Sequence, residues 1–301
     1  MKTFGLDIGG TKILAGAWDG HTLRKVLRIS TPETLPEFYN CIEQLVRNLS
    51  IGMTSSDVSI GVGIPGTVAT DGTCWVPHLP YLSGLPLAEA LSTRLACVAR
   101  VDNDAALALV AETWRGHARG HHNVLLLALG TGIGGAVLMH NDLYRGSHGT
   151  AGAFGWLRVQ KGREWVTWED VASGAALARM ARLVSPSMTA EEVVQASRTD
   201  PAAQQLIIQW ATSLGMGIAS LVSIFDPELV LITGGVAAAA EVFLPIVRNV
   251  VQYHASPSTR STLIQSAMLG PMAPLWGAIR LASEPIDKQH YLEGAKYYED
   301  R

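Results

Sequence analysis

The chain has 301 residues, of which 48% are hydrophobic and 16% are charged, and its formal net charge is −3. This composition excludes disorder over most of the chain, because disordered proteins are poor in apolar residues. With 26 acidic and 23 basic residues, the chain lacks the electrostatic footprint of a protein that binds nucleic acid or an anionic membrane.

Cysteine usage and the first residues favour the cytoplasm. Cys41, Cys74 and Cys97 are few, odd in number and not in CxxC spacing, which favours a reducing compartment over a disulfide framework. The opening MKTFGLDIGG lacks the pattern of a signal peptide. The longest apolar run, 124–139, is too short and too rich in glycine for a spanning helix. We therefore expect a cytoplasmic protein without a membrane segment.

The first half of the chain begins with a hairpin and continues with alternating helices and strands. Apolar runs on either side of a glycine turn predict two strands, and the later apolar spacing changes to that of a helix. In chain order we expect strands at 3–8, 12–18 and 22–30, a helix at 36–49, a strand at 59–64, a helix at 87–95, a strand at 96–101 and a helix at 104–114.

The second half repeats this order, which is typical of a duplicated domain. We expect strands at 123–129, 136–140 and 143–145, helices at 169–183 and 203–225, a strand at 229–233, a helix at 238–251, a strand at 263–266 and a helix at 275–282. The sequence therefore predicts an α/β fold of two related lobes, 1–116 and 117–285, facing a central cleft, with a peripheral tail at 286–301. Binding sites favour such clefts, at the carboxyl ends of strands.

The first glycine turn is suited to binding phosphate. Asp7 ends a strand, and Gly9, Gly10, Thr11 and Lys12 follow it. Glycine lets backbone N–H groups approach an anion closely, and the threonine and lysine add polar contacts. Asp7 is suited to holding a hydrated Mg²⁺, which uses few carboxylates and keeps several waters. The alternative is an ordinary hairpin with an aspartate beside its turn.

A matching turn occurs at the equivalent place in the second half, with Gly130, Thr131, Gly132 and Gly134. It fits GxGxxG by letter, but a strand follows rather than the helix that a dinucleotide fingerprint requires. Two such hairpins facing one cleft would hold phosphates from two sides. Gly234 and Gly235 end a later strand before a predicted helix, where N–H groups and close backbone approach suit a nucleotide. The alternative for this pair is a simple strand-to-helix turn.

Asn103 and Asp104 are the predicted catalytic pair. They lie between a predicted strand and a predicted helix, so Asp104 is expected at a strand end that faces the cleft. A carboxylate there can accept the proton of an attacking hydroxyl that Asn103 orients. The alternative is that Asp102 or Asp104 only caps the helix.

Taken together, these motifs resemble the ROK family of bacterial sugar kinases and repressors, which has the actin-like (ribonuclease H-like) ATPase fold. The resemblance spans residues 4–282. It rests on LDIGGTK at 6–12, GIPG at 63–66, NDA at 103–105, LGTGIGG at 129–135, HGTAG at 148–152, SGAAL at 173–177 and TGGV at 233–236.

The resemblance implies an ATP-dependent sugar kinase that uses Mg²⁺. The first, second and last glycine motifs would hold ATP, and Asp104 would be the base that activates a hydroxyl, by resemblance the 6-hydroxyl, of a hexose or an amino or modified hexose. The residues implied to contact the sugar are Asn103, Asp104, Glu169, Gly66 and His78, the last in place of the family's usual asparagine. Family members often dimerise, so a homodimer is a further expectation, although no residue defines its interface.

Two departures from the family pattern concern the sugar and a metal. Ala153 and Trp156 stand where the family usually has a glutamate and a histidine that reach the sugar. The family's zinc-binding cysteine run is replaced by 160–168, which has no cysteine or histidine, so we expect no zinc. In its place we expect Trp156, Trp165 and Trp168 to form a small apolar cluster that holds the loop.

These departures leave two functions open. Loss of two hydrogen-bonding groups suggests a less hydroxylated, substituted or differently oriented sugar. The aromatic residues Trp75, Tyr81 and Trp156 are candidates to stack on it, or alternatively fill core space. A kinase is favoured because Asp7, Asp104 and both glycine turns are present. The alternative is a non-catalytic, sugar-sensing ROK protein without a DNA-binding domain.

Overall fold

The computed structural model describes residues 2–50 and 58–283, which form two compact units. Unit 1 comprises the chain up to Ala111, Arg145–Thr150, and the chain from Met272 on; unit 2 comprises Glu112–Tyr144 and Ala151–Pro271. This division differs from the predicted lobes, 1–116 and 117–285, because two segments from the second half pack into unit 1. The predicted tail, 286–301, lies outside the described residues.

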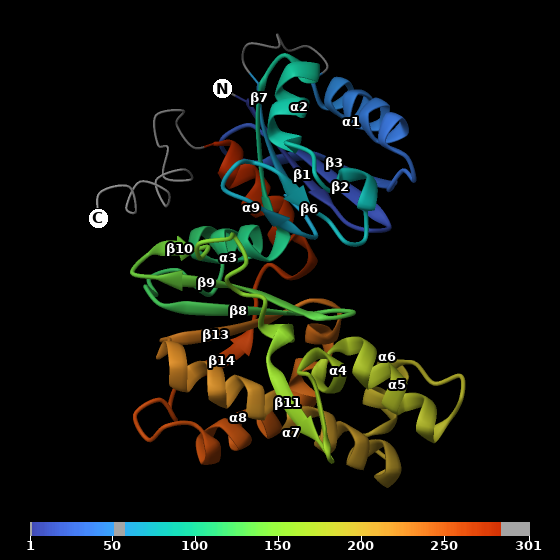
Figure 1. Cartoon of the computed structure of the whole chain (residues 1–301), viewed down its shortest axis with the longest axis vertical. Helices are drawn as coiled ribbons and strands as arrows, with labels where there is room; N and C mark the ends of the chain where they lie inside the picture. The colour runs from blue at the N-terminus through green and yellow to red at the C-terminus, as the bar shows by residue number, and fades with distance from the viewer. Residues whose placement is uncertain (1, 51–57, 284–301) are drawn as a thin grey trace. The chain divides into compact units, whose positions relative to one another are not determined.

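Unit 1 contains a mixed five-stranded sheet with the order β3-β2-β1-β4-β7 (Figure 1). Strands β1, β4 and β7 are parallel, whereas β2 and β3 add antiparallel strands at one side. The strands are β1 (Lys2–Ile8), β2 (Lys12–Trp18), β3 (Leu23–Ser30), β4 (Val58–Ile64) and β7 (Val98–Asn103), with a small pair, β5 (Thr67–Val68) and β6 (Cys74–Trp75). The helices are α1 (Leu35–Leu49), α2 (Leu87–Leu95), α3 (Asp104–Arg115) and α9 (Ala273–Ala282).

Helix α9 joins unit 1 because glycines in the sheet allow it to approach closely. A Cβ added at Gly61 of β4 would lie 1.9 Å from the carbonyl oxygen of Ala278, and one at Gly5 of β1 would lie 2.7 Å from the Ile279 side chain. The Ser59 hydroxyl also donates to the Ala282 carbonyl, at 2.8 Å. The sequence predicts this helix but not its partner, because the contact joins residues more than 200 positions apart.

Unit 2 repeats the sheet order of unit 1, as β10-β9-β8-β13-β14. Its strands are β8 (Val124–Leu129), β9 (Ile133–Met139), β10 (Asp142–Tyr144), β13 (Leu229–Thr233) and β14 (Leu263–Ser266). In both units a three-stranded antiparallel meander is followed by parallel strands. The same topology twice confirms that the fold is duplicated.

Helices α4 (Glu169–Ala172), α5 (Gly174–Val184), α6 (Ala190–Ala196), α7 (Pro201–Phe225) and α8 (Ala240–His254) belong to unit 2. The single helix predicted at 169–183 is broken at Ser173, whose side chain caps α5 by accepting from the Ala176 N–H. Helix α7 is long and apolar enough to cross a membrane by length and composition alone. Many of its apolar residues, including Trp210, Leu214 and Ile218, are fully buried in the core of unit 2, as in the core helix of a globular protein.

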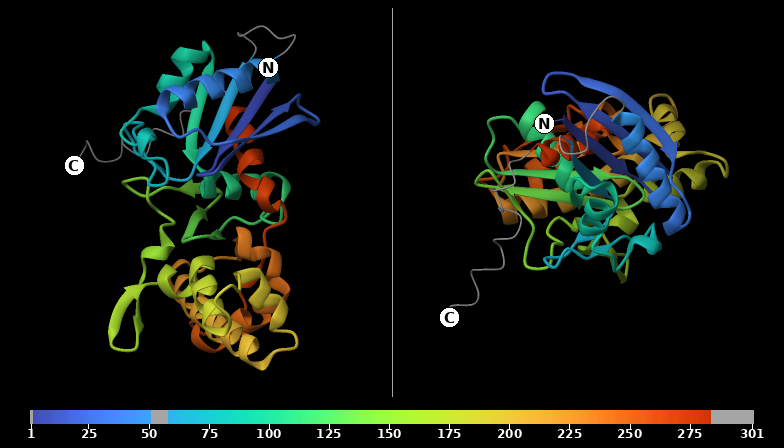
Figure 2. Two further views of the ribbon diagram at one scale, coloured as in Figure 1. Left: turned by 90° about the vertical axis from the view of Figure 1, so that its right-hand side faces the viewer. Right: turned by 90° about the horizontal axis from the view of Figure 1, so that it is seen from above.

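A hairpin, β11 (Arg158–Lys161) and β12 (Glu164–Thr167), occupies the region where the sequence predicts no element. Figure 2 (left) shows it in yellow-green, standing out from unit 2. The predicted tryptophan cluster is wrong here: Trp156 and Trp165 are 67% and 64% exposed, and only Trp168 is buried. Of the three tryptophans only Trp168 anchors the loop, packing against Gly217 and donating from Nε1 to the Ser213 carbonyl at 2.9 Å.

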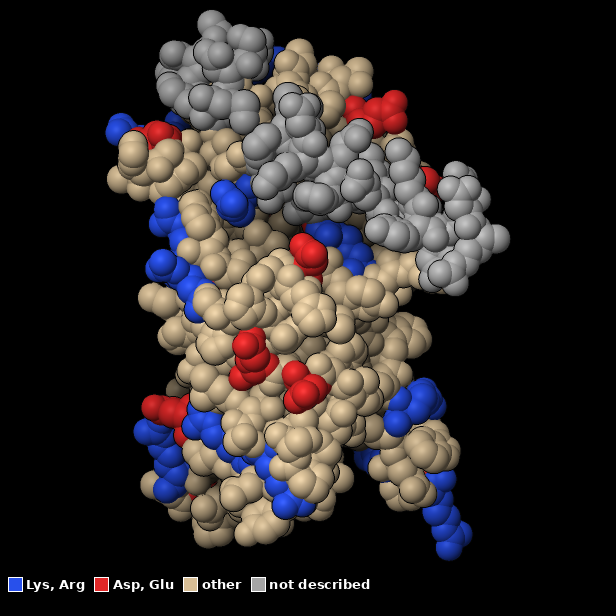
Figure 3. All heavy atoms as spheres, turned by 90° about the vertical axis from the view of Figure 1, so that its left-hand side faces the viewer, with Lys and Arg blue, Asp and Glu red and all other residues tan. Residues whose placement is uncertain are grey.

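Charged side chains are sparse on the surface. On the face drawn in Figure 3 most of the surface is uncharged, and some basic and acidic side chains lie next to each other.

Candidate active site

The first part of the site lies in unit 1, where three parallel strands end. Asp7 is near the end of β1, and Asp104 follows directly after β7. Strand β4 runs between them and contributes Gly63, which is paired with Asp7. A Cβ added at Gly63 would be 3.8 Å from both the Asp7 Oδ1 and the Asp104 Cα. Asp7 and Asp104 therefore lie on either side of β4, close enough for the charge of Asp104 to act on Asp7.

Both carboxylates have a raised pKa. Burial raises the pKa of Asp7 from 3.8 to about 7; the negative charge of Asp104 adds to this, and Lys12 opposes it. Burial also raises the pKa of Asp104 from 3.8 to about 6. Two carboxylates with raised pKa values beside a glycine turn are typical of a functional site, because such groups are poised to exchange protons near neutral pH.

Asn103 organises the start of α3. Its Oδ1 accepts from the Ala106 N–H at 2.9 Å, and its Nδ2 donates to the Gly66 carbonyl at 2.8 Å and to the Asp104 Oδ1 at 3.2 Å. Asn103 is therefore the residue that caps the helix, rather than either aspartate. Asp104 accepts from the Ala105 N–H through Oδ1. Its Oδ2 has no hydrogen-bond partner among residues 2–50 and 58–283, so this oxygen is available to a substrate proton.

Asp102, which the sequence suggests only as a cap, has a different role. It is buried, and its Oδ2 pairs with the Arg145 guanidinium at 2.5 Å, while its Oδ1 accepts from the Asn103 N–H. The ion pair ties the segment Arg145–Thr150 to the end of β7, next to Asn103 and Asp104. Sequence reasoning missed it because the partners are 43 positions apart.

The first glycine turn joins β1 to β2. Gly9 donates to the Lys12 carbonyl at 2.8 Å, and the Thr31 hydroxyl donates to the Gly9 carbonyl at 2.7 Å. Gly10, Thr11 and Lys12 are exposed. His78 is exposed too, and its Cβ lies 3.6 Å from where a Cβ of Gly10 would be. All of these residues belong to unit 1: the first glycine turn, His78, Gly66, Asn103 and Asp104.

The second glycine turn, in unit 2, is held by helices α4 and α5. Glu169, the first residue of α4, accepts from the Ile133 N–H at 3.2 Å, and the Gly174 N–H donates to the Gly130 carbonyl at 2.8 Å. The Glu169 Oε2 would be only 2.5 Å from a Cβ of Gly132, so the glycine is required for this contact. Gly130, Thr131 and Gly134 are exposed.

The third glycine pair borders a small pocket in unit 2. Gly234 has φ +94°, which suits glycine, and the chain forms a short 3₁₀ turn before α8 begins. The pocket has a volume of about 230 Å³ and is lined by residues that include Leu177, Val194, Arg198, Gly235 and Val236. Helix α6 supplies part of its wall, and sequence reasoning missed this helix. The capping box formed by Thr189 and Glu192 was the signal that could have revealed it.

The departures from the family pattern occupy exposed positions. Ala153 and Trp156 are exposed in unit 2, and Trp75 is 54% exposed in unit 1. The core-filling alternative is therefore wrong for both tryptophans. Tyr81 instead packs against Phe38, and its hydroxyl donates to the Pro32 carbonyl at 2.6 Å. Among the described residues, no group of three or more His, Cys, Asp or Glu side chains could hold a metal ion.

Comparison with known proteins identifies the family. The model of the ROK family matches residues 3–285. The chain belongs to the ROK family.

The ROK relatives cover almost the whole chain. A glucokinase from Streptomyces coelicolor is 30% identical over 317 residues, covering 94% of this chain and 98% of the relative. An N-acetyl-D-glucosamine kinase from Salmonella paratyphi B is 28% identical, covering 91% and 97%. The structure of a ROK glucokinase from Streptomyces griseus, in complex with glucose and AMPPNP, is 30% identical with a TM-score of 0.79, covering 94% of this chain and 99% of that one. These similarities confirm the predicted ROK membership and actin-like α/β fold.

Proposed function

We propose that this ROK protein is an ATP-dependent carbohydrate kinase that transfers the γ-phosphate of ATP to the 6-hydroxyl of a hexose or an amino or modified hexose. The observation that carries the proposal is Asp104: a carboxylate at a strand end, with one oxygen held by backbone and the other available. The names of its relatives, glucokinases and N-acetyl-D-glucosamine kinases, support the reaction class.

Asp104 is proposed as the base. Its Oδ2 would accept the proton of the attacking hydroxyl while Asn103, fixed by Gly66 and Ala106, orients that hydroxyl. The oxygen would then attack the γ-phosphorus in line, and ADP would leave. The raised pKa of Asp104 favours this role, because a base whose pKa lies near the working pH both accepts and releases its proton readily.

The glycine motifs are proposed to bind ATP. Gly9, Gly10, Thr11 and Lys12 in unit 1 and Gly130, Thr131, Gly132 and Gly134 in unit 2 would contact the phosphates. The 230 Å³ pocket at Gly235, lined by both apolar residues such as Leu177 and Val236 and polar residues such as Glu191 and Arg198, is proposed to take the adenine ring. Asp7 fits a hydrated Mg²⁺, since a single carboxylate beside a phosphate turn leaves the other positions to phosphate and water. When bound, Mg²⁺ neutralises phosphate charge.

Sugar contacts are proposed from Asn103, Asp104, Glu169, Gly66 and His78. The Glu169 Oε1 has no hydrogen-bond partner among the described residues, so it is available to a sugar hydroxyl. Ala153 and Trp156 offer no charged group, which favours a sugar with an apolar substituent or a missing hydroxyl on that side. The same departure favours the second candidate, a sugar sensor that does not phosphorylate.

The test is ADP release with MgATP over a panel of hexoses, N-acetylhexosamines, deoxysugars and amino sugars, with Asp104→Asn as the blank. We expect sugar-dependent turnover on at least one compound and loss of about 10²–10⁴-fold in kcat for the variant, with sugar binding retained by calorimetry. Turnover that survives in Asp104→Asn would contradict the base assignment. Sugar binding without any turnover would assign the protein as a sensor.

A further inference from the structure

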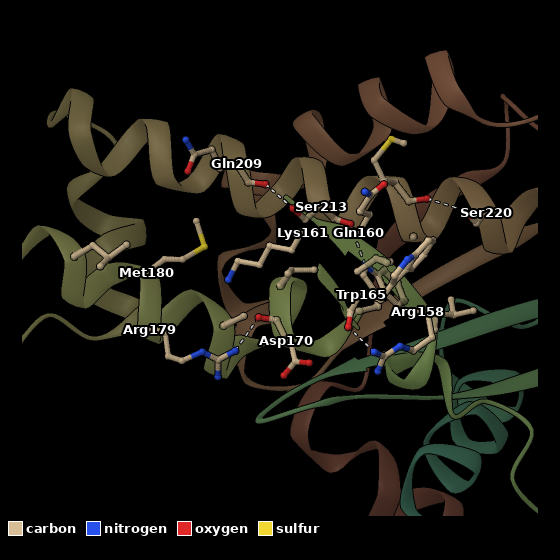
Figure 4. A pocket seen from close by; sticks show the side chains of 18 residues that line it. Arg158, Gln160, Lys161, Trp165, Asp170, Arg179, Met180, Gln209, Ser213 and Ser220 are labelled. Carbon is tan, nitrogen blue, oxygen red and sulfur yellow. Dashed lines mark hydrogen bonds between the residues drawn. The ribbon is translucent and has the colours of Figure 1, made fainter. Parts of the chain in front are cut away.

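A cavity in unit 2 lies between the β11–β12 hairpin and the helices α4, α5 and α7, outside the proposed catalytic residues. Its volume is about 850 Å³, within the range of small-molecule sites. Figure 4 shows the hairpin on one side and α7 and α5 around it. Helix α7 contributes Ser213, Met216 and Ser220 to the wall.

The lining combines an apolar interior with basic side chains. Val159, Val171, Ala176 and Met180 supply apolar surface, and the buried Trp168 also lines the cavity. Methionines at both walls, Met180 and Met216, adapt to ligands of different shape. Trp165 and Leu183 line the cavity while being 64% and 80% exposed, which is unusual for large apolar side chains on a solvated surface.

The charges of the lining favour an anion. Three basic residues, Arg158, Lys161 and Arg179, face one acidic residue, Asp170. The N–H and hydroxyl of Thr167 bind the Asp170 carboxylate and lower its pKa, and the charges of Arg179 and Arg158 lower that pKa further, so this single carboxylate offsets only part of the positive charge.

The three basic side chains differ in their hydrogen-bond partners. Arg158 donates to the Trp165 carbonyl and Arg179 donates to the Asp170 carbonyl. Lys161 has no hydrogen-bond or ion-pair partner within residues 2–50 and 58–283. In Figure 4 its side chain extends from the hairpin toward Met180 and Arg179. An anionic head group between Lys161 and Arg179 would receive charge-assisted hydrogen bonds from both.

We propose that this cavity is a second, non-catalytic binding site for a small amphipathic carboxylate, with its head group at Lys161 and Arg179 and its apolar body against Met180, Met216 and Trp165. The concave shape and the excess of basic groups favour this ligand over a neutral one.

Two residues that line the cavity are also the chain neighbours of Glu169, which belongs to the proposed active site. Trp168 and Asp170 line the cavity, and Glu169 between them directs its carboxylate to the second glycine turn. An occupant that shifts Trp168 would therefore shift Glu169. This effector role rests on the proposed kinase function, whereas the binding site does not.

The binding test uses two fluorescent probes that share a fused-ring body. 8-Anilinonaphthalene-1-sulfonate is anionic, and N-phenyl-1-naphthylamine lacks the sulfonate. We expect the Lys161→Gln/Arg179→Gln variant to bind the anionic probe at least about tenfold more weakly, equivalent to about 1.4 kcal/mol, and the neutral probe unchanged. The matched control is Arg163→Gln/Arg182→Gln, on the same hairpin and helix but outside the lining, which should bind both probes as the wild type does.

Displacement identifies the ligand class. Decanoate should displace the anionic probe, and decan-1-ol at the same concentration should not. Equal binding by the double variant and its control, or equal displacement by the alcohol, would overturn the proposal. The proposal would also be overturned if a dimer forms at higher protein concentration and probe binding falls as it forms, because a second copy would then cover the cavity.

Saturating decanoate should also change the KM for sugar in the wild type but not in the double variant. An unchanged KM would overturn the effector role.

Discussion

At the scale of single residues, the chemistry depends on where two carboxylates are buried. Asp7 lies near the end of β1 and Asp104 directly follows β7, on either side of β4 and its Gly63. Burial makes both acids harder to ionise, and the charge of Asp104 raises the pKa of Asp7 further. A carboxylate with a raised pKa, close to the glycine turn that is proposed to bind phosphate, is suited to proton transfer near neutral pH.

The raised pKa of Asp104 predicts that kcat/KM decreases at acidic pH. Asp104 must be ionised to accept a proton, so kcat/KM should fall as the pH drops below about 6, approaching tenfold per pH unit. A pH profile of kcat/KM in buffers of constant ionic strength measures this decrease. A profile that stays flat down to pH 5 would contradict the assignment of Asp104 as the base.

The raised pKa of Asp7 predicts a gain in stability on neutralisation. The folded chain keeps a proton on Asp7 up to about pH 7, whereas the unfolded chain releases it near pH 3.8. Folding stability therefore falls as the pH rises through this window. We expect Asp7→Asn to melt higher than wild type at pH 8, by about 2–4 °C per kcal/mol relieved, and the difference to vanish near pH 4. Asp142→Asn, an exposed aspartate, is the control; an equal shift there would argue against burial as the cause.

Glu169 connects the proposed sugar site to the second glycine turn. Its carboxylate holds the Ile133 N–H, so its removal should loosen the turn as well as remove a sugar contact. We expect Glu169→Ala to raise the KM for ATP and for sugar by about tenfold each. Glu169→Gln should restore the KM for ATP, because its amide oxygen can accept from Ile133. An increase confined to the sugar KM would show that the turn does not depend on Glu169. Glu164→Ala on the exposed hairpin serves as the control.

At the scale of elements, glycines decide which segments can pack together. Helix α9 lies so close to β4 that a Cβ at Gly61 would meet the Ala278 carbonyl at 1.9 Å. Backbone cannot move aside as a flexible side chain can, so the helix would have to shift away from the sheet.

We expect Gly61→Ala to lower the free energy of unfolding by about 3 kcal/mol, measured by urea denaturation. Gly134→Ala is the matched control for stability, because no atom lies within 4 Å of its added Cβ. It should change the free energy of unfolding by less than about 1 kcal/mol. Similar losses in the two variants would show that the cost arises from glycine replacement in general and not from α9 packing.

At the scale of the whole molecule, a ROK chain has kept its duplicated fold while losing the residues of the family's zinc loop. The hairpin β11–β12 takes the place of that loop, and the Trp168 ring fixes its base against α7 through Gly217 and Ser213. Buried aromatic surface and a hydrogen bond thus hold the base of the hairpin to α7.

This arrangement predicts a kinase that does not depend on zinc. Residues 153–168 contain neither thiolates nor imidazoles, the ligands that structural zinc prefers. We expect purified protein to contain substoichiometric zinc by plasma mass spectrometry. Dialysis against a zinc chelator, followed by restoration of Mg²⁺, should leave kcat and the melting temperature unchanged. Stoichiometric zinc, or loss of activity that zinc alone restores, would contradict this prediction.

The sequence by itself determined the features that depend on local pattern. Strand and helix periodicity, glycine turns and the order of motifs predicted the duplicated α/β fold and ROK membership. Each of these patterns depends only on residues that are near one another in the chain. The helix that was missed, α6, carried a local signal in its capping box. The hairpin was missed because its strands are only four residues long and pair with each other alone.

Only the tertiary structure decided which distant residues meet. It paired Asp102 with Arg145, docked α9 on unit 1, directed Glu169 to the second glycine turn, and left Trp156 and Trp165 exposed while burying Trp168. Each of these depends on contacts between segments far apart in the chain. Burial and desolvation, which raise the pKa of Asp7 and Asp104, arise from that same packing and have no counterpart in a local pattern of residues.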